Sequence, residues 1–215
     1  MSALLLVLLS VAALLCAFKL VIAKNDPPSR FYTDDRESNA VHLLMNGTMA
    51  LMLTPLYDIK IRVAVIFTYW LAVVVLAVRI SIAYRAKNAS ASNRNYSIAS
   101  GGYHLFSIVA MIYAIYRMPV TTAADMKTMY MPVVPGYASM ILGGIFLCDA
   151  IIFVVMIFGF PQMLMTAMSD VGSAGRLGKR AGNGLDSSTI AELRISGLPH
   201  IVMDVGMAAM LFMLV

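Results

Sequence analysis

The sequence has few charged residues: only 13% of its 215 positions are Asp, Glu, Lys or Arg, while 60% are hydrophobic. Soluble domains carry about 25% charged residues, so this composition excludes an ordinary water-soluble domain. The only two cysteines, Cys16 and Cys148, form no CxxC pair, which excludes a disulfide framework. The net charge of +5 is not accompanied by basic stretches interleaved with aromatic residues, so we expect no nucleic-acid binding.

Motifs of common catalytic sites are also absent. The chain contains no nucleophile elbow, no HExxH zinc motif and no GxxxxGK[ST] phosphate-binding loop. The spacing of the acidic residues predicts no pair of carboxylates at a matching depth in the membrane. We therefore expect a protein that is not an enzyme and has no nucleotide site.

Long apolar runs make up most of the chain. A bilayer core about 30 Å thick is crossed by roughly 20 residues of α-helix. Six segments fit this requirement, at residues 3–23, 41–57, 63–84, 103–118, 137–160 and 198–215. The first has no basic residues before its apolar run, so we expect a retained helix and not a removable signal peptide. The prediction is an all-α polytopic membrane bundle, with about six transmembrane helices in three hairpins and one membrane domain over residues 1–215.

Lysine and arginine are distributed unevenly between the two sides of the predicted bundle. The regions after the first, third and fifth segments hold twelve of them, against four after the second and fourth. Because basic residues stay in the cytoplasm, both termini are expected outside and the three longer loops inside. Residues 161–197 include "GSAGRLGKRAGNG", which predicts a flexible, Gly-rich, basic cytoplasmic loop. Thr189 and Glu192 form a capping box for a short helix leading to Pro199, which suits the first turn of the last span.

A histidine opens every second predicted span, and the residues that follow it repeat. The three stretches are "HLLMNGTMALM" from His42, "HLFSIVAMIYA" from His104 and "HIVMDVGMAAM" from His200. Methionine stands at position +7 in all three, and at position +3 in the first and third. Steps of three and four residues keep these side chains on one helix face. Since alternate spans cross in the same direction, the three histidines are predicted to meet at one depth.

Two interpretations of this repeat stay open. Methionine is a flexible apolar residue that packs well between helices, so the repeat can be plain packing. The alternative is a Cu(I) site, because thioether and imidazole ligands both suit copper. The candidate metal ligands are His42, His104, His200, Met45, Met49, Met111, Met203 and Met207. Three methionines of an outer loop, Met126, Met129 and Met131, could collect Cu(I), while haem b held by two histidines is a third, weaker alternative.

Polar residues next to the histidines supply further predictions. Asn46 and Asp204 each follow a histidine by one turn, where they can accept a hydrogen bond and fix the ring. Arg79 falls at about the depth of Asp204, which predicts an ion pair between them. Asp149 lies in the middle of the fifth span, where a carboxyl group must face a partner, a cavity or another protein.

The six-helix layout, the segment "HLLMNGTMALML" and the His–Met spacing together resemble an uncharacterised, DUF5134-like family of small polytopic membrane proteins from actinobacteria. The resemblance implies no established activity. Proteins of similar size and character serve as accessory subunits of actinobacterial respiratory supercomplexes, which is an analogy only. MxxxM pairs such as Met45–Met49 also look like those of eukaryotic copper-uptake channels.

Two functions follow as expectations. The first is a non-catalytic accessory subunit in the bacterial plasma membrane. It would pack against other membrane protein subunits of a larger complex, such as a respiratory one with a copper oxidase, and carry the candidate Cu(I) site. The alternative is a stand-alone protein that binds Cu(I) or lets it permeate.

Overall fold

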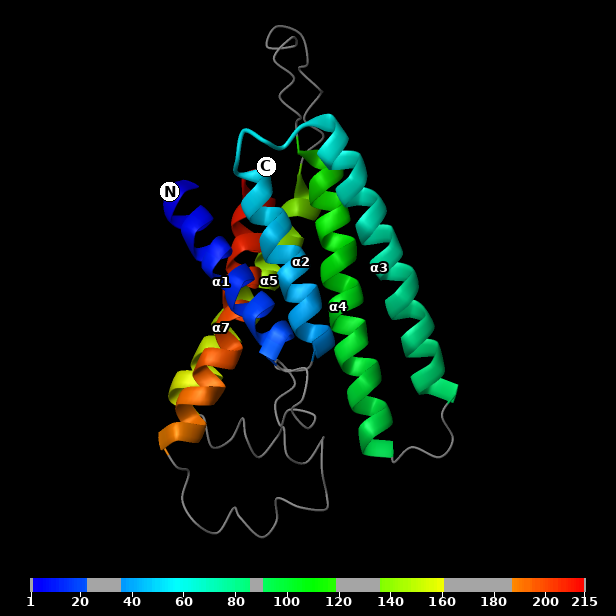
Figure 1. Ribbon diagram of the computed structural model, residues 1–215, viewed down its shortest axis with the longest axis vertical. Coiled ribbons are helices and arrows are strands. Elements are labelled where there is room, and N and C mark those ends of the chain that lie inside the picture. The colour runs from blue at the N-terminus through cyan, green and yellow to red at the C-terminus, as the bar shows by residue number, and fades with distance from the viewer. Residues whose placement is uncertain (1, 23–35, 86–90, 119–135, 161–186, 215) are drawn as a thin grey trace, which may run out of the picture.

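The computed structural model describes residues 2–22, 36–85, 91–118, 136–160 and 187–214, which form helices and no strands. The helices are α1 (Ser2–Ile22), α2 (Arg36–Met52), α3 (Ile59–Arg85), α4 (Ala91–Arg117), α5 (Tyr137–Gly159) and α7 (Ser187–Phe212) (Figure 1). All except α2 are long and apolar enough to cross a membrane. The predicted helical membrane bundle is confirmed, and the chain is a multi-pass membrane protein in a lipid bilayer.

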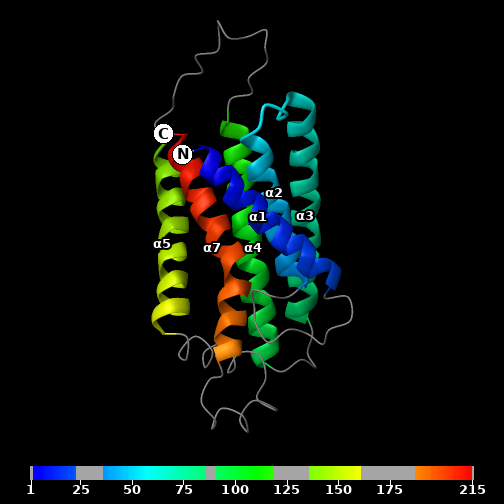
Figure 2. The ribbon, with the colours of Figure 1, turned by 60° about the vertical axis from the view of Figure 1, so that its left-hand side comes forward.

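The helices associate as the three predicted hairpins. The most extensive contacts are α1 with α2, α3 with α4, and α5 with α7. In Figure 1, α2, α4 and α7 run in one direction and α1, α3 and α5 run in the other. The start of α1 and the end of α7 therefore lie at the same end of the bundle, as Figure 2 also shows.

Each hairpin contributes one inner and one outer helix. Within the bundle, α2 contacts both α4 and α7, and α4 also contacts α7. In the apolar windows of α4 and α7, 56% and 61% of the residues are buried, against 22% in α1 and α5 and 11% in α3. The histidine-bearing helices therefore form the interior, and the other three present apolar side chains outward.

Two glycines on α7 allow its neighbours to approach closely, as small residues commonly do between membrane helices. A Cβ built at Gly206 would lie 3.0 Å from Leu9 Cδ2 of α1 and 3.1 Å from Met49 Sδ of α2. A Cβ at Gly197 would overlap Ile157 of α5 and lie 2.9 Å from Phe153 Cε1. These contacts fix the position of α7 between the other helices.

Some predicted boundaries were wrong because hydropathy marks the membrane-embedded part of a helix and not its ends. Helix α7 begins at Ser187, so residues 187–197 of the expected loop are helical, and Pro199 lies inside the helix instead of in its first turn. The short helix expected before Pro199 is the start of α7 itself. Helix α4 likewise begins at Ala91, before the predicted residue 103.

Candidate metal centre

Three buried histidines meet inside the bundle, one from each inner helix. The ring centroid of His42 lies 5.5 Å from that of His104 and 5.4 Å from that of His200. His42 and His104 have no exposed surface, and His200 is 3% exposed. His200 Nδ1 lies 3.4 Å from His42 Nε2, within hydrogen-bond distance. The rings therefore share one layer of the bundle, as their spacing predicted.

A serine stands one turn before each of these histidines, a repeat that the sequence analysis missed. The stretches are "SNAVH", "SGGYH" and "SGLPH", and their serines are Ser38, Ser100 and Ser196. All three serines are buried in the interior. The repeat becomes visible when the residues before the three histidines are aligned as well as those after them. Hydroxyl groups therefore lie before the histidine layer, while the core after it combines methionines with buried polar side chains such as Asn46, Ser107 and Asp204.

Two carboxylates approach the other side of the His200 ring. Asp149 Oδ2 of α5 and Asp204 Oδ2 of α7 each lie 3.3 Å from His200 Nε2. Tyr103, which the sequence analysis did not single out, donates its hydroxyl to Asp204 Oδ1 at 2.7 Å. The expectation that no carboxylates pair at a matching depth was wrong, because the antiparallel α5–α7 hairpin brings Asp149 level with Asp204.

Asp149 also faces a cavity, one of the surroundings predicted for it. A recess of about 520 Å³ lies between α4 and α5. It is lined by Tyr103, Phe106, Ile141, Gly144, Ile145, Phe146, Cys148, Asp149 and Ile152. Its walls are mainly apolar, and the Asp149 side chain is 39% exposed. The recess therefore connects this carboxylate with the outside of the bundle.

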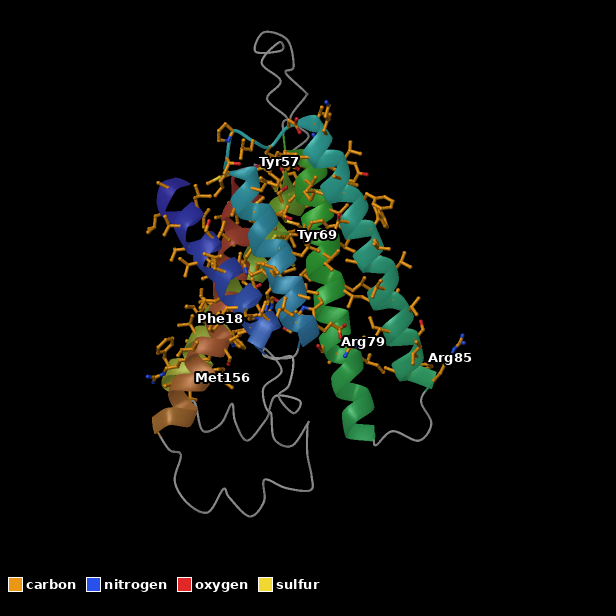
Figure 3. The ribbon with its side chains drawn as sticks, in the orientation of Figure 1. Phe18, Tyr57, Tyr69, Arg79, Arg85 and Met156 are labelled. Atoms are coloured by element: carbon orange, nitrogen blue, oxygen red, sulfur yellow. The ribbon has the colours of Figure 1, made fainter. Side chains whose placement is uncertain are left out.

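The predicted Arg79–Asp204 ion pair is replaced by another pair. Arg79 forms a salt bridge with Glu37 at the start of α2. Figure 3 shows Arg79 extending from α3 toward the interior, while Arg85 points away from the bundle. The predicted depth of Arg79 was also wrong. Its partner Glu37 precedes His42 on α2, whereas Asp204 follows His200 on α7, so the two groups lie on opposite sides of the histidine layer.

The two predicted partners of the histidine rings behave differently. Asp204 lies beside its own histidine, as expected from the one-turn spacing. Asn46 does not bond to His42, because its Nδ2 donates to the Pro199 carbonyl of α7 at 3.3 Å. This bond joins α2 to α7. His42 Nδ1 has no hydrogen-bond partner among the residues that the structure describes.

The predicted methionine ligands all lie in the apolar core. Met45, Met49, Met111, Met203 and Met207 have no exposed surface and belong to one hydrophobic cluster. This burial accounts for them as packing residues, and metal binding by them stays a prediction. The outer methionines Met126, Met129 and Met131 lie outside the described residues.

A family model described as "Domain of unknown function (DUF5134)" matches residues 34–214. The match covers helices α2 to α7, and so includes the three histidines, Asp149 and Asp204. It confirms the resemblance to an uncharacterised family that the sequence suggested. No curated protein and no solved structure matches the chain.

Proposed function

Since the chain belongs to the DUF5134 family, for which no activity is described, we propose its function from the site itself. The protein is a non-catalytic membrane protein that binds a copper ion at the centre formed by His42, His104 and His200. The observation that supports this proposal is the convergence of three buried imidazoles from three helices. Ionisable residues inside a membrane are energetically costly and are usually kept for function.

The distance between the ring nitrogens suits a shared metal ion. Metal–imidazole bonds of about 2.0–2.1 Å place two ligand atoms of one ion roughly 3.3–3.6 Å apart. His42 Nε2 and His200 Nδ1 are 3.4 Å apart, and the His104 ring lies beside that of His42. Small rotations of these rings would therefore direct their nitrogens at one point.

Copper is the metal that both candidate ligand types accept. Imidazole and thioether bind copper, and thioethers bind the cuprous ion without losing a proton. Met45 and Met203 follow their histidines by three residues, which is about 4.5 Å along a helix. Both are buried in the same interior, so they are the thioethers best placed to join the histidines.

Metal analysis of the purified protein tests this proposal. We expect about one copper per chain after loading with Cu(I), and loss of that copper in His42→Gln, His104→Gln and His200→Gln. Ser139→Ala serves as the control, because Ser139 is also buried but its hydroxyl pairs with that of Tyr113. Wild-type copper content in all three glutamine variants would refute the proposal. A haem absorption spectrum of the purified protein would show that the histidines bind haem instead of copper.

A second candidate function is that of an accessory subunit in a larger membrane complex. The recess between α4 and α5 favours it, because a partner helix would cover its apolar walls and the partly exposed Asp149. Gly144→Trp should then reduce co-purification in mild detergent, since a Cβ at Gly144 meets nothing within 4 Å. Val74→Trp on the exposed face of α3 is the control. If no partner co-purifies with the wild type, the stand-alone copper protein remains.

The orientation is part of the same proposal. The distribution of basic residues supports placing both termini outside a bacterial plasma membrane. A reporter domain that is active only outside the cytoplasm should then be active when fused to either terminus, and a reporter that needs the cytoplasm should be inactive there. Activity of the cytoplasmic reporter at both termini would show that the topology is the reverse of the proposed one.

A further inference from the structure

We propose a second metal site, for a divalent cation that prefers oxygen and nitrogen ligands, formed by Asp149, His200 and Asp204. These residues offer ligand atoms that all lie within 4.8 Å of one another. The site uses the Nε2 side of the His200 ring, whereas the histidine centre uses its Nδ1 side. It goes beyond copper binding and does not depend on it.

The two distances from His200 to the carboxylates match those of a coordination shell. Ligand atoms bound at about 2.0–2.2 Å in a tetrahedral site stand roughly 3.3–3.6 Å apart. His200 Nε2 lies 3.3 Å from Asp149 Oδ2 and 3.3 Å from Asp204 Oδ2. Three protein ligands leave one coordination position, and the recess beside Asp149 has room for a water molecule there.

The hydrogen bonds around Asp204 leave one of its oxygens available. Oδ1 accepts the Tyr103 hydroxyl, which fixes the carboxylate plane. Oδ2 is fully buried and accepts no hydrogen bond from the described residues, although it lies close to the His200 ring. A buried carboxylate oxygen without a partner is costly, and its position beside the other two ligands supports a cation site there.

A cation would also balance the charges of the two carboxylates. Among the described residues, no Lys or Arg forms a salt bridge with Asp149 or Asp204, and Arg79 is paired with Glu37. If His200 donates its Nδ1 hydrogen to His42, its Nε2 lone pair faces the two carboxylate oxygens. A divalent ion would satisfy all three acceptors together and would neutralise two carboxylates.

The recess places one ligand of this site at the surface of the bundle, apart from the histidine layer. Asp149 is 39% exposed and lines the recess between α4 and α5. His200 and Asp204 lie behind it in the interior, and Tyr103 lines the recess beside it. Asp149 is therefore the ligand that an entering ion meets first.

Zinc binding to the stripped full-length protein in detergent tests the proposal, with Zn²⁺ alone as the probe. We expect about one Zn²⁺ per chain, and at least a tenfold loss of affinity in Asp149→Asn and in Asp204→Asn. Tyr103→Phe should weaken binding about 10–100-fold, as expected for the loss of a ligand's orienting partner. Cys148→Ser is the control, because this exposed thiol lies next to Asp149 and could bind zinc by itself.

The variants separate this site from the copper centre. His42→Gln and His104→Gln should lose copper and keep zinc, while the two asparagine variants should lose zinc and keep copper. Should Asp204→Asn fail to fold, Asp149→Asn and Tyr103→Phe still decide the result. Zinc affinity equal to the wild type in Asp149→Asn would overturn the proposal.

Discussion

Gly197 sets how closely α7 approaches α5, so replacing it with alanine should destabilise the bundle. The new Cβ would overlap Ile157 and would lie 2.9 Å from Phe153 Cε1. Forcing an extra methyl group into such a packed interface costs about 1–3 kcal/mol. Alanine in a helix recovers about 1 kcal/mol relative to glycine, so a net loss of about 1 kcal/mol is expected.

The assay is unfolding in mixed detergent micelles, with Gly102→Ala as the matched control. A Cβ at Gly102 meets nothing within 4 Å, so this variant should gain up to about 1 kcal/mol. The two substitutions are chemically identical and differ only in their surroundings. If Gly197→Ala were as stable as Gly102→Ala, the close α5–α7 contact would be wrong, and with it the approach of Asp149 to His200.

Two further predictions concern the core and the ion pair. Met111→Leu should change the free energy of unfolding by less than about 1.5 kcal/mol, because the side-chain volume is conserved. The variant should keep its copper, because Met111 stands about 10 Å along the helix from His104. Loss of copper in the Met111→Leu variant would show that Met111 takes part in metal binding. Glu37→Ala and Arg79→Ala should each cost no more than about 1 kcal/mol, since both side chains are partly exposed. A double-mutant cycle without coupling between them would contradict the pair.

The meeting of the histidines was predictable because it depends only on helical periodicity and on the alternation of direction between spans. Predicting that His42, His104 and His200 meet required no knowledge of the loops. The same regularity predicted the three hairpins and the depth of Asp204 beside His200.

The contacts that depend on which helices are neighbours were not predictable. Counting residues along the third span misplaced Arg79, whose carboxylate partner is Glu37, before the histidine layer and not after it. Tyr103 belongs to the α3–α4 hairpin and Asp149 to the antiparallel α5, so no spacing within one helix relates either residue to Asp204 on α7. The start of α7 was missed because a helix continues beyond its apolar part.

The short α2 makes the two paths from the histidine centre to water unequal. Six residues separate Arg36 from His42, which is about 9 Å of helix, whereas ten residues or about 15 Å lead on to Met52. The shorter path is bordered by hydroxyl and amide side chains such as Ser38 and Asn39, and the longer one by methionines and hydrocarbon side chains with Asn46 and Thr48 among them. An ion held by the histidines would therefore exchange with water mainly through the side on which α2 begins, and the opposite side would act as a barrier.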